Sequence, residues 1–326
     1  MIADIYKRLA KALALVTVMS AGTVFAEVYP LPPRDVDIIG ELRTVEVQEG
    51  ETLLDIGRRY GLGYEEMKLA NPGVDVWLPE VGRKVVVPTR FILPPGPREG
   101  LVLNLPEMRL YYYPPVRPGE QPTVETYAVS IGRMDWRTPL GEARVVTKVK
   151  DPAWYPPESI KQEARAEGRE MPAVVPAGPD NPLGRYAMRL SIPGYLIHST
   201  NRPWGVGMRA THGCVRMYPE DIEGLFPRVP VDTPIRIINE PYKVGWFAGK
   251  LYLEVHPVLE EHQSEFDKPL KAVVEKVAAK LGDSDERVDH SRLRMTLEIV
   301  DGIPMPISRD TTPPLQLTAN FRDLAE

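Results

Sequence analysis

The sequence predicts a multidomain protein with a small α+β module of βααβ order, a larger mainly-β domain and a small C-terminal α+β extension. The chain of 326 residues, 43% of them hydrophobic, is long enough for about two ordinary domains with their own cores. Its 35 prolines are roughly twice the average share, which disfavours a helix bundle. Short alternating segments at roughly regular spacing through the middle of the chain favour a sandwich or barrel-like β domain, and the fold class expected for it is a sandwich.

The N-terminus and the charge of the chain limit where it acts and what it binds. A basic start over residues 1–11 and an uncharged, mainly apolar run over residues 12–25 precede Ala26, so residues 1–26 are predicted to be an export signal. The alternative is an uncleaved membrane anchor, but the run is shorter than the ~20 residues of a spanning helix. We therefore expect no stable membrane span. With a net charge of −5 and no basic patch, no nucleic-acid partner is expected.

A compact unit is predicted over residues 42–88. An alternating strand is followed by Thr52, a suitable N-cap, and by a short helix that ends at Gly61, where a left-handed C-cap belongs. A second short helix over residues 64–70 and a closing strand over residues 84–88 complete the βααβ order.

This unit, with its segments VQEGETLLDIGRRYG and NPGVD, resembles a LysM module. The resemblance implies binding of N-acetylglucosamine-containing glycans such as peptidoglycan in a shallow groove between two loops. It offers five candidate contacts in those loops, for which helix capping and turn formation are equally good explanations: Gly50, Glu51, Thr52, Asn71 and Pro72.

A linker over residues 89–98 is predicted to lead into the mainly-β domain, residues 99–239. Strands are expected as a pair over residues 100–114 and singly over 124–132 and 143–149. Residues 151–185 interrupt this rhythm with proline-rich ends and a charged helix over 158–167. An insertion of this length ahead of a candidate site is often a lid, and the alternative is a surface excursion without a role.

The C-terminal part, residues 240–326, has elements of both kinds. After a short helix over 218–226 and a strand over 235–238, we expect a strand over 250–255, a helix over 265–281 and a strand over 293–300. The predicted helix carries an apolar stripe of Leu270, Val273, Val274, Val277 and Leu281. The histidines at 256, 262 and 290 are expected to be surface or packing residues.

Residues 197–217, IHSTNRPWGVGMRATHGCVRM, concentrate the reactive side chains. They contain His198, His212 and Cys214, the single cysteine of the chain. An exported chain with one cysteine cannot form an internal disulfide, so the thiol is reactive or pairs with a partner. A thiolate attacks carbonyl groups when a base removes its proton, and two imidazoles lie close in the sequence. Zinc is an alternative, but side-by-side ligands on one loop suit tetrahedral metal poorly, so neither metal nor cofactor is expected.

The segments IHSTNRPWGVGMR and THGCVRM strongly resemble the active-site signature of L,D-transpeptidases of the YkuD type, and SIG…TPLGEA and PAGPDNPLGRYAM extend the likeness over residues 99–239. The resemblance implies that Cys214 is the nucleophile and His198 the proton acceptor and donor. It implies that the main-chain carbonyl of Ser199 orients the imidazole. The amides of Gly213 and Cys214 would line the oxyanion hole, with His212 beside them. Ser199 is often glycine in this family.

Further contacts to the substrate are expected around this signature. Arg209 and Arg216 are candidates for pairing with peptide carboxylates, because a guanidinium binds them in bidentate fashion, and ordinary surface charge is the alternative. Tyr186 and Asn201 are further candidates.

The order of export signal, LysM module and catalytic domain is similar to the Gram-negative periplasmic branch of the family. That branch attaches murein lipoprotein to peptidoglycan or makes 3→3 cross-links. The implied reaction forms a thioester at meso-diaminopimelate, releases D-Ala and transfers the acyl group to an amine. Two alternatives remain open: an L,D-carboxypeptidase or amidase that uses water, and a non-catalytic cell-wall-binding protein.

Overall fold

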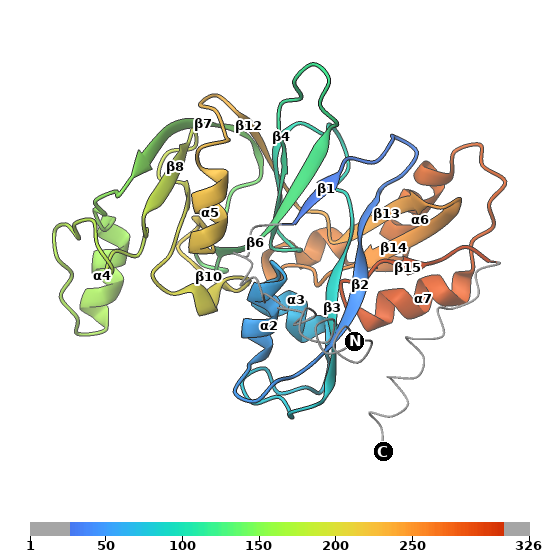
Figure 1. Ribbon diagram of the computed structural model, residues 1–326, viewed down its shortest axis with the longest axis horizontal. Coiled ribbons are helices and arrows are strands. Elements are labelled where there is room, and N and C mark those ends of the chain that lie inside the picture. The colour runs from blue at the N-terminus through green and yellow to red at the C-terminus, as the bar shows by residue number, and fades with distance from the viewer. Residues whose placement is uncertain (1–26, 310–326) are drawn as a thin grey trace, which may run out of the picture.

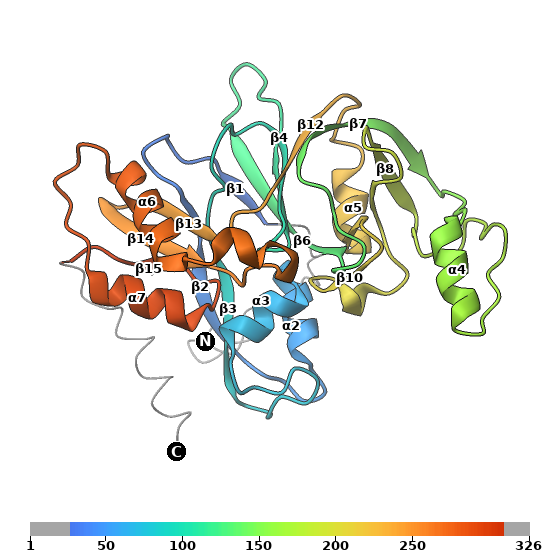
Figure 2. The same cartoon turned by 180° about the vertical axis from the view of Figure 1, so that it is seen from behind.

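The computed structural model describes residues 27–309 as a mostly-β protein with few helices. In Figures 1 and 2 the insertion with its helix α4 and the C-terminal helices α6 and α7 lie at opposite ends of the molecule. The main sheet and helices α2 and α3 lie between them. The predicted export signal, residues 1–26, falls outside the described residues. Within residues 27–309, no helix combines the length and apolar character needed to cross a membrane.

The βααβ module has the predicted element order. Strand β2 (Ile38–Glu46), helices α2 (Leu53–Arg59) and α3 (Tyr64–Ala70), and strand β3 (Lys84–Ile92) follow one another. Thr52 caps α2, because its hydroxyl accepts from the Asp55 amide and the Asp55 carboxylate accepts from the Thr52 amide. Gly61 has φ +64°, the left-handed conformation expected after a helix. These capping predictions are confirmed.

The predicted linker is shorter than expected. Strand β3 continues to Ile92, and its residues 89–92 pair with residues 38–41 of β2. Phe91 and Leu93 are buried in one apolar cluster with Val102 and Tyr111 of the main sheet. These side chains bury apolar area against the next domain. Residues 89–93 are therefore part of a strand and of the apolar core, and the module packs directly on the mainly-β domain.

The main sheet closes on itself. Its strand order is β1-β6-β11-β9-β8-β7-β12-β4-β5, and β5 also pairs with β6, while β10 adds to β6. Strand β6 is ten residues long, so residues 125–128 pair with β5 and residues 129–130 pair with β11. Of the two forms expected for the mainly-β domain, the closed sheet corresponds to the barrel-like one rather than to an open sandwich. The strands are β1 (Val28–Pro30), β4 (Gly100–Asn104), β5 (Arg109–Tyr113), β6 (Thr123–Gly132), β7 (Gly141–Lys150), β8 (Tyr186–Leu190), β9 (Leu196–His198), β10 (Arg209–Thr211), β11 (Val215–Met217) and β12 (Pro234–Ile238).

Two helices and one 3₁₀ turn accompany this sheet. Helix α4 (Glu158–Ala166) belongs to the insertion, and α5 (Pro219–Leu225) buries Ile222 and Leu225 in the core of the sheet. The 3₁₀ turn η1 (Pro203–Gly205) lies in the loop between β9 and β10.

The C-terminal part forms a separate three-stranded sheet with two helices. It contains β13 (Tyr242–Phe247), β14 (Lys250–Val255), the 3₁₀ segment η2 (Glu260–Phe266), α6 (Pro269–Leu281), α7 (His290–Ile299) and β15 (Met305–Pro306). The strand predicted over residues 293–300 is wrong. Asp289 caps a helix there, accepting from the amides of Ser291 and Arg292, and Leu293 and Thr296 bury one helical face.

The apolar stripe predicted for α6 is narrower than expected. Val273 and Val277 are buried, whereas Leu270 and Val274 are 39% and 45% exposed. A helix that packs against a small sheet on one side buries only the positions that face it, so the outer members of the stripe remain in solvent.

A buried ion pair holds the βααβ module on the main sheet. Arg109 of β5 donates from Nε and Nη2 to the two carboxylate oxygens of Glu66 in α3, at 2.7 and 2.9 Å. Arg109 Nη2 also donates to the carbonyl of Gly61 at 3.0 Å. Burial raises the pKa of Glu66, and the nearby Arg109 charge opposes this effect.

Arg109→Met should destabilise the protein by about 3–5 kcal/mol, because it leaves the Glu66 carboxylate without its partner in a dry interface. Denaturant unfolding measures the loss. The exposed Arg117→Met is the matched control and should change stability little. A loss in the free energy of unfolding below ~1 kcal/mol for Arg109→Met would contradict a stabilising role for this ion pair.

Candidate active site

Strands β9 and β11 bring the predicted nucleophile and base to one face of the sheet. They are parallel neighbours in which Val215 pairs with Ile197 and Arg216 pairs with His198. Val215 and Ile197 are buried in the core of the sheet. Because side chains alternate along a strand, Cys214, Arg216 and His198 point to the opposite face. Cys214 and His198 are sixteen positions apart in the sequence, and the fold brings them together because Cys214 directly precedes β11 and His198 ends the neighbouring strand β9.

The imidazole of His198 is buried and held by main-chain carbonyls. Its Nδ1 lies 2.6 Å from the carbonyl oxygen of Ser199. The Ser199 amide donates to the carbonyl of Tyr186 at 2.9 Å, which ties this loop to β8. Burial, followed by the positive charge of Arg216, lowers the pKa of His198 to about 4, against hydrogen bonds to the Ser199 and Leu183 carbonyls that raise it. The ring is neutral at pH 7.

The thiol of Cys214 is protonated at rest. Burial raises its pKa above the ordinary value, while a main-chain hydrogen bond with Leu196 and the charge of Arg216 act in the opposite direction. Its Sγ lies 3.7 Å from the carbonyl oxygen of Gly194. With a neutral thiol and a neutral imidazole, the site does not hold a preformed ion pair.

The buried His198 should make folding stability depend on pH. The folded pKa of about 4 lies below the ordinary 6.5, so between these values the unfolded chain binds a proton that the folded protein excludes. Stability should therefore fall as pH drops from 6.5 toward 4. At pH 5 the loss from this group is about 2 kcal/mol relative to pH 7.5. Denaturant unfolding of the protein and of His198→Gln at both pH values measures it, and an equal drop in the two proteins would contradict the assignment.

A tight turn precedes Cys214. Gly213 has φ +96°, and a Cβ atom there would lie 2.7 Å from the ring of Tyr195, so only glycine fits. The Gly213 carbonyl accepts from Thr138 Oγ1 at 2.8 Å. The Gly213 amide donates to Thr211 Oγ1 at 3.2 Å, and that hydroxyl donates to the Cys214 carbonyl at 2.6 Å. The Gly213 amide is thus engaged within the turn, contrary to its expected place in an oxyanion hole.

His212 contacts the insertion. Its Nε2 lies 2.7 Å from Oε2 of Glu163 in α4. Arg133, just after β6, donates to Oε1 of the same carboxylate. The ring of Trp136 meets the His212 ring edge-on, with centroids 5.1 Å apart. Sequence reasoning missed Arg133, Trp136 and Glu163, because nothing distinguishes them from other charged or aromatic loop residues.

Three of the four predicted substrate contacts have partners within the chain. Arg209 Nη2 lies 2.7 and 2.8 Å from the two oxygens of Glu261, so its guanidinium is already neutralised. The hydroxyl of Tyr186 donates to Glu223 at 3.0 Å, and the amide of Asn201 donates to the Asp180 carbonyl at 3.2 Å. Each of the three side chains is held by a partner within the fold, and because the Arg209 guanidinium is already paired with Glu261, its expected pairing with a substrate carboxylate is not supported.

Arg216 differs from these. Its Nε is buried and has no hydrogen-bond partner among the described residues. Burial and the neighbouring charge of Arg202 lower its pKa. A guanidinium with this environment, on the same face as Cys214, suits an anionic ligand.

Three of the predicted glycan contacts have partners within the chain, and two are exposed. Asn71 is buried and structural, since its side-chain amide bonds the main chain of Met67 and Val86, so its expected place in the groove is wrong. Thr52 caps α2, and Glu51 accepts from Arg59 at 2.5 Å. Gly50 and Pro72 are exposed.

An aromatic side chain that the sequence did not single out lies in the same region. Trp77 is 49% exposed in the loop after α3, and its ring centroid lies 6.4 Å from that of Tyr64. The main chain joins this loop to the start of α2, because the Leu53 amide donates to the Val76 carbonyl at 2.9 Å.

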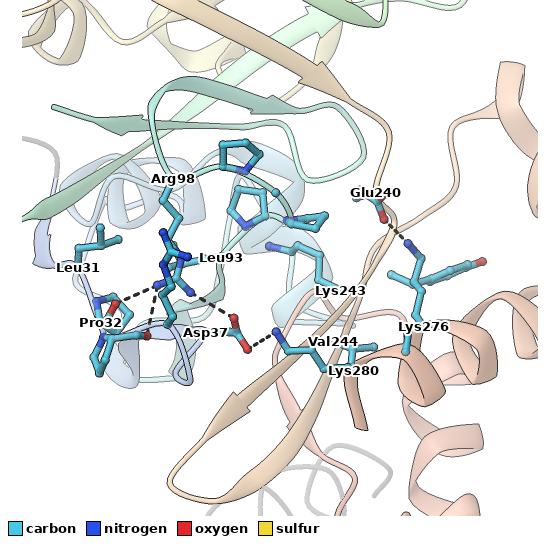
Figure 3. A pocket seen from close by; sticks show the side chains of 18 of the residues that line it. Leu31, Pro32, Asp37, Leu93, Arg98, Glu240, Lys243, Val244, Lys276 and Lys280 are labelled. Atoms are coloured by element: carbon cyan, nitrogen blue, oxygen red, sulfur yellow. Dashed lines mark hydrogen bonds and ion pairs between the residues drawn. The ribbon is translucent and has the colours of Figure 1, made fainter. Parts of the chain in front are cut away.

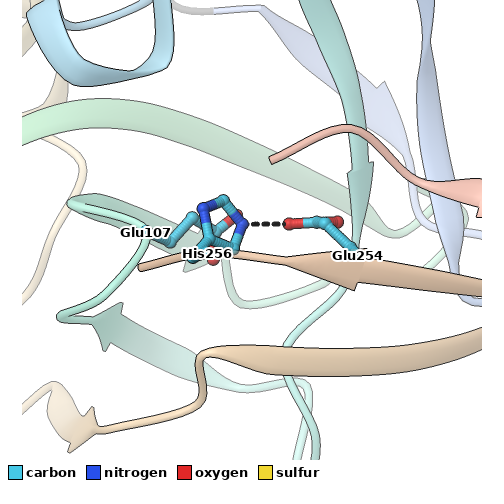
Figure 4. A group of neighbouring side chains, drawn as sticks. All are labelled: Glu107, Glu254 and His256. Atoms are coloured by element: carbon cyan, nitrogen blue, oxygen red, sulfur yellow. Dashed lines mark hydrogen bonds and ion pairs between the residues drawn. The ribbon is translucent and has the colours of Figure 1, made fainter. Parts of the chain in front are cut away.

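Glu107, Glu254 and His256 form a buried cluster whose ligand atoms lie within 4.8 Å of one another, the spacing of a metal site (Figure 4). The ammonium group of Lys243 lies 2.7 Å from Glu107 and 2.8 Å from Glu254, so a cation already occupies the centre. The cluster is a charge network that joins the C-terminal part to the main sheet. Sequence analysis expected His256 to be a surface or packing residue, and the structure buries it in this network.

A cleft of about 970 Å³ lies between residues 31–37, the segment over residues 93–99 and the C-terminal part (Figure 3). Arg98 and Lys280 both pair with Asp37, at 3.2 and 2.6 Å, and Lys276 pairs with Glu240. None of its lining residues comes from residues 197–217, so it is separate from the candidate active site.

Comparison with known proteins defines the class. Residues 98–237 match the L,D-transpeptidase catalytic domain (YkuD), and residues 45–88 match the LysM domain. The chain is 41% identical over 286 residues to "Probable L,D-transpeptidase ErfK/SrfK" of Salmonella typhimurium strain LT2, covering 86% of this chain and 91% of the relative. It is 36% identical over 298 residues to "Probable L,D-transpeptidase YcfS" of Escherichia coli K12, covering 90% and 92%.

It is also 40% identical over 260 residues to "Probable L,D-transpeptidase YbiS" of the same strain, covering 78% of this chain and 83% of the relative. The chain therefore belongs to the L,D-transpeptidase family. Its two domains together imply peptidoglycan as the ligand and action outside the cytoplasm.

Proposed function

We propose that the protein is a periplasmic L,D-transpeptidase that uses Cys214 as nucleophile and His198 as general base and acid on peptidoglycan stem peptides. The observation that supports the proposal is the pairing of β9, which ends at His198, with β11, which Cys214 directly precedes, together with the bond from His198 Nδ1 to the Ser199 carbonyl. That carbonyl takes the orienting place that a carboxylate holds in other triads.

The first half of the reaction forms a thioester. The Cys214 proton passes to His198 as sulfur attacks the carbonyl carbon of the third stem residue, meso-diaminopimelate. The C–N bond to the terminal D-Ala then breaks, and the departing amine takes the proton from His198. Since thiol and imidazole are both neutral at rest, the proton must pass from Cys214 to His198 for the sulfur to attack.

The second half transfers the acyl group. An amine of the acceptor attacks the thioester carbon, His198 takes its proton, and the C–S bond breaks to return the Cys214 thiol. The acceptor is a diaminopimelate amine of another stem or the lysine of a murein lipoprotein. Water in the same place would give a tripeptide instead.

The surrounding residues have supporting roles in this proposal. The Cys214 amide stabilises the oxyanion, while Gly213 gives the turn its shape. Arg216 binds an anionic group of the substrate. The docked module places its glycan-binding loops at a fixed position relative to the site, because the amides of Tyr64 and Glu65 donate to the carbonyls of Val206 and Gly207, at 3.0 and 3.2 Å.

Incubation of the protein without residues 1–26 with disaccharide-tetrapeptides, followed by mass analysis, tests the proposal. Dimers that lack one D-Ala indicate 3→3 transfer, and attachment only when lipoprotein is added indicates that acceptor. Tripeptides alone indicate hydrolysis and contradict transfer. No conversion under any of these conditions would contradict the enzymatic reading of the site.

A further inference from the structure

We propose that Arg133 and His212 form a binding site for a carboxylate of the peptide substrate, and that Glu163 of the insertion occupies this site until the substrate displaces it. The inference rests on the proposed function for the identity of the ligand. In this proposal, one residue of the expected lid, Glu163, competes with the substrate for one subsite.

The two donors are arranged for a carboxylate. Arg133 Nη2 and His212 Nε2 lie 3.4 Å apart, and each contacts a different oxygen of Glu163. Paired donors that each take one oxygen are the arrangement with which proteins hold carboxylate groups. The Trp136 amide donates to the Arg133 carbonyl at 2.8 Å, which shapes the turn that carries Arg133, and the Trp136 ring packs on His212.

The donors and the acceptor belong to different parts of the fold. Arg133 follows β6 and His212 lies between β10 and β11, so both lie in short loops joined to strands of the main sheet. Glu163 lies on α4, a nine-residue helix of which only Ala164 is buried. Little apolar area holds α4 down, so the helix can move while the donors remain fixed.

The position of the site favours a substrate group as its ligand. His212 is two residues from Cys214, and the side chains of Arg133 and His212 are 38% and 31% exposed. The contacts with His212 and Arg133 also lower the pKa of Glu163, so the group that occupies the site is an anion. The tetrapeptide carries two free carboxylates near the bond that breaks: the C-terminus of D-Ala and the side-chain carboxylate of diaminopimelate.

Binding of disaccharide-tetrapeptide to the full chain carrying Cys214→Ala, measured by calorimetry, tests the inference without turnover. Adding Glu163→Gln removes the competing anion and should tighten binding about tenfold, the value of one charge-assisted hydrogen bond. Glu158→Gln removes an equal charge from the same helix, where Glu158 pairs with Arg165, and should leave binding unchanged. Arg133→Ala should weaken binding about tenfold, and Arg133→Lys should weaken it less.

Tetrapeptides amidated at one carboxylate or the other identify the ligand, since the gain from Glu163→Gln should vanish for one of them. Equal effects of Glu163→Gln and Glu158→Gln, a gain that survives amidation of both groups, or no binding to any variant would each overturn the inference. A peptide that binds as described and is not converted by the chain with Cys214 would instead overturn the proposed function and leave the site standing.

Discussion

Cys214→Ala should abolish every product, with a rate loss on the order of 10⁴-fold or more, because the thioester cannot form without its sulfur. Cys214 is the only thiol of the chain, so no second cysteine can replace it. Cys214→Ser should be similarly inactive, since the buried environment that already raises the pKa of the thiol disfavours an alkoxide still more.

The measurement is product formation from disaccharide-tetrapeptides, with thermal unfolding as the control for folding. Because the Cys214 side chain is small and partly buried, its truncation to alanine should change the stability of the protein little. Residual activity of a folded Cys214→Ala protein above about 1% would contradict its role as nucleophile.

His198→Gln should lower the rate of acylation by about 10²–10⁴-fold, the usual contribution of a positioned general base. In the protein with His198, activity should persist well below pH 6.5, because the imidazole stays neutral down to about pH 4. In His198→Gln, the remaining rate should rise with pH as the thiolate forms without help.

Rate–pH profiles of both proteins measure these effects. His290→Gln, at the start of α7 in the C-terminal part, is the matched control and should behave like the unchanged protein. An acid limb near pH 6.5, or a rate loss below about tenfold, would show that His198 is not the base in the proposed form.

Local sequence signals predicted much of the fold. Thr52 and Gly61 carry capping information within a few positions, and together with the alternating segments on either side they predict the βααβ order. The order of the strands in the main sheet had no such local signal. The closure depends on pairings between strands far apart in the sequence, such as β12 with β4 and β11 with β6, and the alternation of apolar residues is the same in a sandwich and in a closed sheet.

Residues 293–300 show why one element was assigned wrongly. Their apolar residues fit a strand and a helix face equally well, and the cap at Asp289 lies outside the segment. Tertiary packing of Leu293 on the C-terminal sheet decided the outcome.

The residues of the candidate site that belong to rare types could be predicted from the sequence, whereas those of common types could not. A single cysteine with two nearby histidines is a strong local signal. Glu163 is one of two acids on α4, and only the fold shows which of them reaches His212. The same limit applies to Arg209, whose pairing with Glu261 joins residues 52 positions apart.

Mass measurement of the intact protein during reaction with disaccharide-tetrapeptide tests the central proposal most directly. We expect a transient covalent adduct of the peptide without its D-Ala, located on Cys214 by digestion and absent from Cys214→Ala. Products that form without any adduct, or an adduct on another residue, would contradict thiol acyl transfer at this site.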